Sequence, residues 1–150
     1  MKKNEGVIIQ SVMRALKILQ CFRGNTEELG ILEISDCINL SKSTTYGLVN
    51  TLKTTGFLEQ NINNKKYHLG IELFELGNLV QSRMDLRDEA KPFCRMLSEK
   101  YNTTVHLAVF HGGDVIYVDK LINNDLQIVS SQVGMRTPMY CTGVGKGILA

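Results

Sequence analysis

The sequence lacks any long hydrophobic run. No apolar stretch approaches the ~18 consecutive residues that a membrane-spanning helix needs, and the charged start MKKNEG leads into no signal-peptide core. We therefore expect a cytoplasmic protein with no membrane partner. The rest of the composition agrees, because 43% hydrophobic and 21% charged residues are the balance of an ordinary soluble chain.

Metal and disulfide patterns are also missing. The four cysteines, Cys21, Cys37, Cys94 and Cys141, form no C-x-x-C and no Cys/His pair at zinc-ligand spacing. We expect buried free thiols in a reducing compartment, and we predict no metal site.

No catalytic constellation stands out either. Ser/His/Asp, Cys/His and paired-carboxylate arrangements are absent from the sequence, and His106 and His111 would point to opposite faces of one predicted strand. The segment GVGKG has the look of a phosphate-binding loop, but that pattern needs glycine in place of Tyr140 and a hydroxyl residue in place of Gly147. We predict that the protein is not an enzyme and uses no cofactor.

Positive charge is in small excess and lies toward the front of the chain. Residues 1–66 contain 9 Lys/Arg against 6 Asp/Glu, a net charge of +3, whereas residues 67–150 contain 8 against 9, a net charge of −1. A mildly basic front half hints at a polyanionic partner.

Three helices and a hairpin are predicted in this front half. Ser11 is expected to cap a helix that Gly24 ends, a second helix fits residues 31–38, and Ser41 is expected to cap a third that Gly56 stops. The short turn between the last two helices is typical of a helix-turn-helix. Two short strands around the polar tip NINNKK then form a hairpin, or wing, beside the third helix.

The second half is predicted as two helices followed by strands. Helical spacing covers residues 71–83 and 86–100, and Pro92 suggests that the second of these begins near Lys91. From Thr103 the period changes to two. The strands are predicted at TTVHLAVFH, VIYVDKL and LQIVSSQV, with a GGD turn between the first two, and a loop that leads into a helix ends the chain.

The third helix is unusual because hydroxyl and basic residues crowd its first turns. A helix N-terminus carries unpaired N–H groups that suit phosphate, and Ser, Thr and Asn side chains can contact phosphates or base edges in a DNA major groove. An ordinary capped and solvated helix is the alternative. The residues predicted to contact DNA are Lys42, Ser43, Thr44, Thr45, Tyr46, Asn50 and Lys53 from this helix and Lys65 and Lys66 from the wing.

Several segments in order resemble the IclR family of bacterial transcriptional regulators: SVMRALKILQCF, LSKSTTYGLVNTLKTTGFLEQ, KYHLGIELFELG and GMRTPMYCTGVGKGILA. The resemblance implies a winged helix-turn-helix domain at 1–70, a linker and dimerisation helix at 71–85, and the first part of a GAF-like effector-binding domain at 86–150, so the fold class is α+β. It also implies a homodimer or dimer of dimers on a palindromic operator in double-stranded DNA, modulated by a small organic acid or aromatic effector.

The chain departs from the family in two respects. Gly47 occupies a place where members often have Arg, so one DNA contact is expected to be missing. Members are also considerably longer, which suggests a truncated sensor domain. By resemblance, the effector would be bound by Leu126 and Val129, for which plain core packing is the alternative, and by main-chain N–H groups of Gly143, Val144 and Gly145.

The sequence therefore predicts a sequence-specific DNA-binding regulator of the IclR type under small-molecule control. The alternative is a winged-helix protein-interaction module that has a small-molecule sensor and does not bind DNA.

Overall fold

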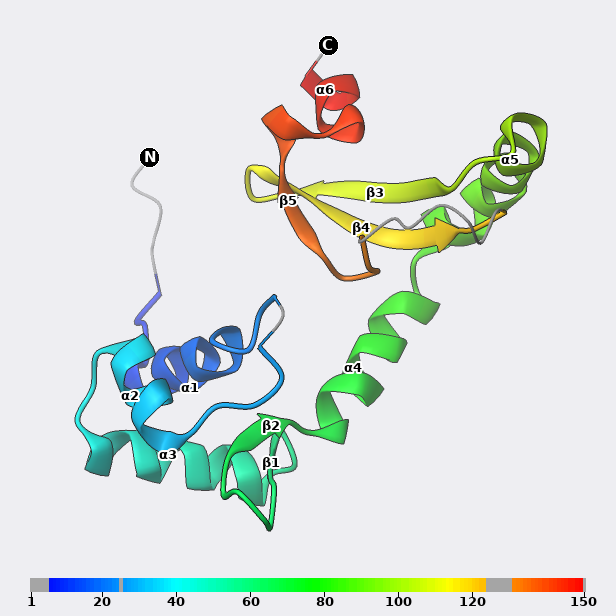
Figure 1. Cartoon of the computed structure of the whole chain (residues 1–150). Coiled ribbons are helices and arrows are strands. Elements are labelled where there is room, and N and C mark those ends of the chain that lie inside the picture. The colour runs from blue at the N-terminus through cyan, green and yellow to red at the C-terminus, as the bar shows by residue number, and fades with distance from the viewer. Residues whose placement is uncertain (1–5, 25, 124–130, 150) are drawn as a thin grey trace. The chain divides into compact units, whose positions relative to one another are not determined.

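A computed structural model describes residues 6–24, 26–123 and 131–149 of the chain (Figure 1). Backbone contacts divide the chain into two compact units, Met1–Asn78 and Leu79–Ala150. The division falls inside helix α4 (Ile71–Ser82).

The first unit is a small helical domain with a hairpin. Its elements are α1 (Gln10–Gln20), α2 (Ile31–Ile38), α3 (Lys42–Thr54), β1 (Leu58–Gln60) and β2 (Tyr67–Leu69). Figure 1 shows α1 and α2 against α3, with the hairpin after the C-terminal end of α3. All of these elements contribute to one buried cluster, made of Ile18, Phe22, Ile34, Val49, Leu52, Leu58 and Tyr67.

Local chemistry sets the limits of these helices. Asn39 ends α2 in the left-handed conformation (φ 52°), Ser41 caps α3 through its side chain, and Gly56 adopts φ +78° after α3. The predicted helix at 31–38, the Ser41 cap and the Gly56 stop are confirmed. The Ser11 cap is wrong, because α1 already begins at Gln10 and no side chain caps it.

The hairpin forms the predicted wing and gains a third participant. β1 and β2 pair antiparallel with Leu58 opposite Leu69. Leu29, in the loop between α1 and α2, bridges to Tyr67 through backbone hydrogen bonds of 2.9 and 2.8 Å. Because Tyr67 pairs with Gln60 next to the hairpin turn, the end of β2 nearest the wing tip is attached to the α1–α2 loop.

The cysteine prediction is wrong for three of the four residues. Cys21 and Cys37 form a disulfide that connects the end of α1 to α2, and their Cα atoms are 6.5 Å apart, within the range that a disulfide can bridge. Cys94 is a buried free thiol as predicted, whereas Cys141 is free but exposed. The sequence spacing gave no sign of the bridge, because helix packing brings its two ends together.

The second unit has a long helix and a three-stranded sheet. Its elements are α5 (Asp85–Tyr101), β3 (Val105–His111), β4 (Asp114–Leu121), β5 (Arg136–Pro138), the 3-10 turn η1 (Met139–Cys141) and α6 (Gly143–Leu149). The strands are antiparallel in the order β3-β4-β5. Arg87 of α5 donates to Asp119 of β4 at 3.2 Å, which ties the helix to the sheet.

Three predictions about this unit are corrected. Pro92 lies inside α5, which begins six residues before Lys91, at Asp85; Asp85 and Asp88 in the first turn suit a helix N-terminus. The third strand of the described sheet is β5, in the segment predicted as a loop. The strand predicted at LQIVSSQV lies mostly outside the described residues, and its described part, 131–133, is in no strand. Asp114 starts β4 opposite His111, so the turn consists of the two glycines before it.

Candidate nucleic-acid interface

Helix α3 divides sharply into a buried and an exposed face. Thr45, Val49 and Leu52 are buried against the core of the first unit. Their spacing of four and three residues is one helix stripe. The side chains that remain exposed on α3 are polar for the most part and include Lys42, Ser43, Thr44, Tyr46, Asn50 and Lys53.

Thr45 is a correction to the predicted DNA contacts. Its side chain is fully buried (0% exposed), and its hydroxyl donates to the Ser41 carbonyl oxygen at 3.0 Å. A threonine can be buried in a helix in this way because the carbonyl four residues earlier accepts its only donor. Thr45 therefore belongs to the core and cannot reach DNA.

Hydroxyl groups cluster at the N-terminus of α3. The Ser41 Oγ atom accepts from the Thr44 backbone N–H at 3.4 Å and lies 2.9 Å from Thr44 Oγ1 and 3.2 Å from Ser43 Oγ. The other N–H groups of this turn add the partial positive charge of a helix start. This exposed end can accept a phosphate oxygen at low electrostatic cost.

Farther along α3, Tyr46 and Lys53 extend the exposed surface. Tyr46 is 57% exposed although it is a large aromatic residue. Lys53 Nζ lies 3.5 Å from Gln60 Oε1, so the end of α3 also contacts the wing. An exposed tyrosine among small polar residues is typical of a contact surface.

The two wing lysines differ in their surroundings. Lys65 is exposed, takes a left-handed backbone (φ 59°) and forms no ion pair among the described residues. Lys66 forms an ion pair with Glu33 of α2 at 3.5 Å. The Gly30 backbone N–H donates to Glu33 at 2.6 Å, and this bond, helped by Lys66, lowers the pKa of Glu33 below its ordinary value. Because Lys66 is held in an ion pair, Lys65 is the better candidate of the two for a phosphate contact.

Sequence reasoning missed the side chains that attach the wing tip to the rest of the unit. Glu28 accepts from Asn61 Nδ2 at 2.8 Å and from Asn64 Nδ2 at 2.6 Å. These two hydrogen bonds lower the pKa of Glu28, and the bond from Asn61 has the larger effect. The asparagines were predicted as turn residues, but nothing in the sequence pointed to an acceptor more than thirty positions earlier.

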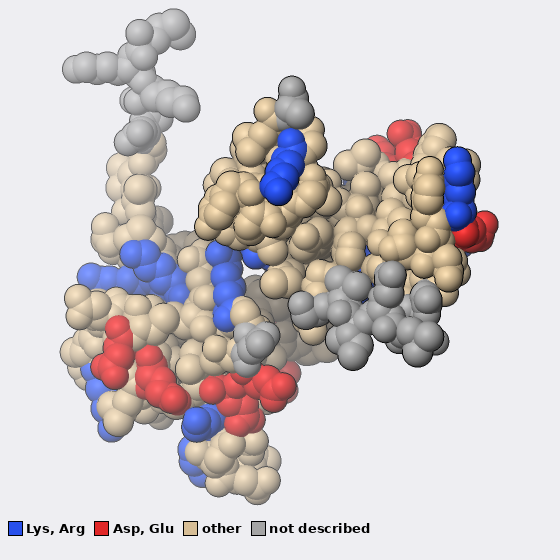
Figure 2. All heavy atoms as spheres, turned by 45° about the horizontal axis from the view of Figure 1, so that its top comes forward, with Lys and Arg blue, Asp and Glu red and all other residues tan. Residues whose placement is uncertain are grey.

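Charged side chains of both signs lie on the face that Figure 2 shows. Lys and Arg side chains and Asp and Glu side chains form separate small groups there. A DNA-binding surface here depends on the polar first turns of α3 as well as on net charge.

The predicted effector residues are only partly described. Leu126 and Val129 lie outside the described residues. Gly143 and Val144 begin α6, but the Gly145 N–H already donates to Thr142 Oγ1 at 2.9 Å. A Cβ atom on Gly145 would lie 2.0 Å from the Met139 carbonyl oxygen, so this glycine is explained by close packing. The prediction that its N–H binds an effector is therefore wrong for this arrangement.

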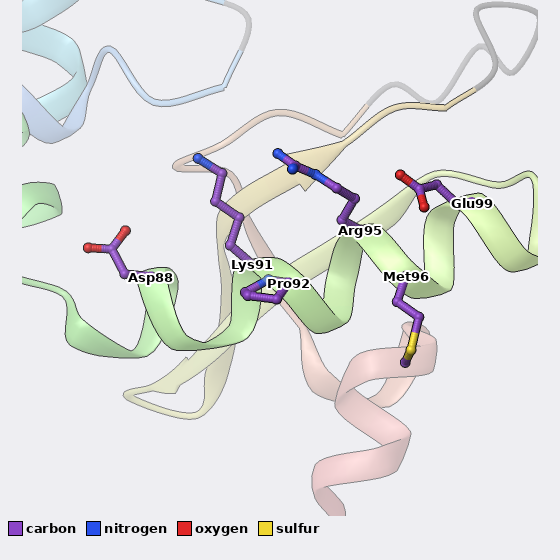
Figure 3. Close-up of a pocket in the computed structure, with 6 residues that line it drawn as sticks. All are labelled: Asp88, Lys91, Pro92, Arg95, Met96 and Glu99. Atoms are coloured by element: carbon purple, nitrogen blue, oxygen red, sulfur yellow. The ribbon is translucent and has the colours of Figure 1, made fainter.

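A hollow of about 350 Å³ on the second unit lies elsewhere and is not enclosed. Figure 3 shows Lys91 and Arg95 projecting to the same side of α5. The described residues that line it come from this one helix and are exposed: Asp88, Lys91, Pro92, Arg95, Met96 and Glu99. The three described effector candidates, Gly143, Val144 and Gly145, are not among them.

No helix among the described residues has the length and apolar character to cross a membrane. No group of three or more His, Cys, Asp or Glu side chains among them is placed to share a metal ion.

Family models match both units. The IclR helix-turn-helix domain matches residues 11–61. The model described as bacterial transcriptional regulator IclR C-terminal matches residues 78–150. The chain belongs to the IclR family. Its mixed α and β fold and its winged helix-turn-helix are therefore as predicted.

Similar proteins of the IclR family are regulators of transcription. The HTH-type transcriptional regulator XynR of Escherichia coli (strain K12) is 40% identical over 143 residues, which are 95% of this chain and 57% of that protein. The HTH-type transcriptional regulator KdgR of the same organism is 35% identical over 142 residues, 95% of this chain and 54% of that protein. The chain spans little more than half the length of these relatives.

Solved structures agree on the fold. A crystal structure of an IclR family transcriptional regulator from Brucella abortus has a TM-score of 0.83 at 26% identity and covers 99% of this chain and 57% of that chain. An IclR homolog from Microbacterium hydrocarbonoxydans, complexed with 4-hydroxybenzoate, has a TM-score of 0.76 at 23% identity and covers 91% of this chain and 56% of that chain. The second likeness concerns the fold alone.

Proposed function

We propose that the protein is a sequence-specific DNA-binding regulator of transcription. The observation that carries the proposal is the division of α3: one face anchors it in the core, its polar first turns and Tyr46 stay exposed, and the wing follows at its C-terminal end. The N-terminal turn would contact phosphate and Asn50 could pair with adenine through two hydrogen bonds. Lys65 and Lys66 would add phosphate contacts from the wing.

Binding of DNA in this manner can be measured directly by fluorescence anisotropy. The probe is a duplex from the region upstream of the protein's own gene, with a scrambled duplex as control, at two salt concentrations. We expect tight, salt-sensitive binding to the native duplex, which Asn50→Ala weakens about tenfold or more through one lost base contact. The variant Gln20→Ala, at an exposed position of α1, is the matched control and should bind as the wild type does.

The same measurement tests the rival function. Equal and weak binding of both duplexes by all three proteins would contradict the proposal. It would favour the alternative in which the winged helix is a protein-interaction module and the chain does not read DNA.

We also propose that the chain is organised as a DNA-binding domain at 1–70, a linker and dimerisation helix at 71–85 and an effector-binding region at 86–150. Support comes from α4, where no described residue is buried and Phe74 is 65% exposed. A dimer, or a dimer of dimers, would cover this apolar surface and present two copies of α3 to half-sites of a palindrome about one helical turn apart. Sedimentation of wild type and Phe74→Glu tests this proposal. The variant should sediment as a species of lower mass than the wild-type oligomer, and equal masses would contradict the proposal.

We propose further that a small organic acid or aromatic compound modulates DNA binding through the second unit. The match to the IclR C-terminal domain supports this role. Effector binding would change the relative populations of two arrangements of the two DNA-binding domains in the dimer. In one arrangement the spacing of the domains matches the spacing of the half-sites, and in the other it does not. A saturable thermal shift with 4-hydroxybenzoate or another small organic acid would support effector binding by these 150 residues, and no shift across a panel of such acids would contradict it.

A further inference from the structure

The wing tip of the first unit is folded by its own asparagines. Asn61 Oδ1 accepts from the Asn63 backbone N–H at 3.0 Å, and Asn64 Oδ1 accepts from the Lys66 backbone N–H at 2.9 Å. Backbone bonds close the same turn: Asn61 N–H donates to the Lys66 carbonyl and Lys65 N–H to the Asn61 carbonyl, both at 2.9 Å. The side-chain oxygens of both asparagines are therefore used to shape the tip, and their amide N–H groups remain for an outside partner.

One carboxylate outside the wing accepts hydrogen bonds from both of those amide groups. Glu28, in the loop between α1 and α2, accepts from Asn61 through one oxygen and from Asn64 through the other, at 2.8 and 2.6 Å. Hydrogen bonds to an ionised acceptor are stronger than neutral ones, and the use of two oxygens fixes orientation as well as distance. The adjacent Leu29 pairs with Tyr67 in the backbone, at the end of β2 next to the wing tip, so the contact of Glu28 continues this bridge.

We propose that Glu28 is a positioning residue that sets the wing, and with it Lys65, for contact with the DNA backbone. This inference rests on the proposed DNA-binding function. The Gln60 side chain of β1 donates to the Lys65 carbonyl at 3.0 Å, and the Lys65 N–H donates to the Asn61 carbonyl, so both bonds come from the wing itself. Among the described residues, no side chain outside the wing forms a hydrogen bond or ion pair with Lys65, so its position depends on the turn that Asn61 and Asn64 form. Lys66 has a tie of its own to Glu33, so the loss of Glu28 should release Lys65 more than Lys66.

The sign of the effect distinguishes positioning from simple electrostatics. A carboxylate near a DNA-binding surface repels phosphate, so removal of its charge alone should tighten binding. If Glu28 positions the wing, its removal should weaken binding. Glu27, exposed and without a hydrogen bond or ion pair among the described residues, offers a matched loss of one negative charge at the neighbouring position.

The test compares Glu28→Gln with Glu27→Gln by anisotropy on the native and scrambled duplexes over a range of salt. Glutamine keeps the size of Glu28, but its amide group can accept only one of the two asparagine bonds. We expect Glu28→Gln to weaken binding about three- to tenfold and to reduce the slope of log K against log salt by about one, the share of one phosphate contact. Glu27→Gln should bind as tightly as the wild type or more tightly.

A double-mutant cycle with Lys65→Ala supplies a readout that a purely structural role would not move. If Glu28 acts through Lys65, Glu28→Gln should add no further loss in the Lys65→Ala background. Asn64→Ala, which removes one of the two amides, should have the same effect as Glu28→Gln and not add to it. This second variant keeps the proposal testable if Glu28→Gln fails to fold.

Two results would overturn the inference. One is wild-type affinity in Glu28→Gln and Asn64→Ala. The other is a loss of DNA affinity that multiplies with the loss caused by Lys65→Ala, because Glu28 would then act on the stability of the whole unit and not through Lys65. Failure of the wild type itself to prefer the native duplex is a different result, since it would contradict the proposed function.

Discussion

At the scale of single residues, two neighbouring threonines of α3 lie in opposite environments, since Thr45 is buried and Thr44 is exposed. We predict that Thr45→Val lowers the free energy of unfolding by about 1 kcal/mol, because the buried bond to the Ser41 carbonyl is lost while the shape is kept. Its DNA affinity should not change. Thr44→Val, at an exposed position, should weaken DNA binding and leave the unfolding free energy within about 0.5 kcal/mol of the wild type. Denaturant unfolding monitored by circular dichroism, paired with anisotropy, measures both effects, and the reverse assignment of the two losses would contradict the division of α3.

The limits of sequence reasoning about the site lie at this same scale. The crowding of polar residues marked α3 as the contact helix, but it did not separate Thr45 from Thr44. A hydroxyl that donates to the preceding helical turn behaves as an apolar group, and that pairing is visible only in the packed structure. The contacts of Glu28 could not be predicted for another reason. They join segments that are far apart in the sequence, and no repeating sequence pattern relates such segments.

The titration of His106 gives a prediction about pH. Its pKa is lowered, first by burial and then by the charge of Lys120, so the unfolded chain takes up the proton more readily than the folded one. As pH falls below the ordinary value of 6.5, stability should therefore fall, until the folded histidine is protonated as well. His106→Gln should remove this component. Unfolding of both proteins between pH 8 and 5 measures it, and an equal pH dependence in the two would contradict the assignment.

At the scale of elements, the return of the wing toward α4 depends on a close backbone approach. The Gly70 N–H donates to the Phe57 carbonyl at 2.9 Å, and a Cβ atom on Gly70 would lie 2.0 Å from the Gly56 carbonyl oxygen. We predict that Gly70→Ala destabilises the first unit by about 2–3 kcal/mol, because backbone must move on both sides. Denaturant unfolding followed by circular dichroism gives the value.

A second glycine supplies the control for that prediction. Gly77 lies in α4 with nothing within 4 Å of its added Cβ atom. Gly77→Ala should stabilise by up to about 1 kcal/mol through helix propensity alone. Equal destabilisation by both substitutions would show that chain flexibility, and not the Gly70–Gly56 contact, decides the outcome.

Elements were predictable where one pattern acted alone. The helix at 31–38 follows from apolar spacing and the start of α3 from its Ser41 cap, and both are confirmed. Prediction failed where two signals conflicted, as at Pro92, whose missing hydrogen bond did not interrupt α5. It also failed at β5, which is only three residues long and is defined by its pairing with β4 more than by its own composition.

At the scale of the whole chain, the two compact units differ in how they are cross-linked. The first contains the Cys21–Cys37 disulfide, whereas the cysteines described in the second, Cys94 and Cys141, are free. A redox change therefore acts on the first unit through one covalent link. In a reducing compartment that link would open, and the unit would depend on its core cluster alone.

Reduction should lower the melting temperature of the first unit and leave the second unchanged. Closing a loop between cysteines 16 residues apart stabilises a domain by about 3 kcal/mol in the chain-entropy model. For a unit of this size that corresponds to a shift of about 10 °C or more. Scanning calorimetry with and without a phosphine reductant measures the shift. Cys37→Ser should melt like the reduced wild type under both conditions, and Cys141→Ser should respond as the wild type does. Two results would contradict the bridge: alkylation of both Cys21 and Cys37 under oxidising conditions, or a melting temperature of the first unit that reductant does not change. The stability of that unit would then come from the packing of α1, α2 and α3 alone.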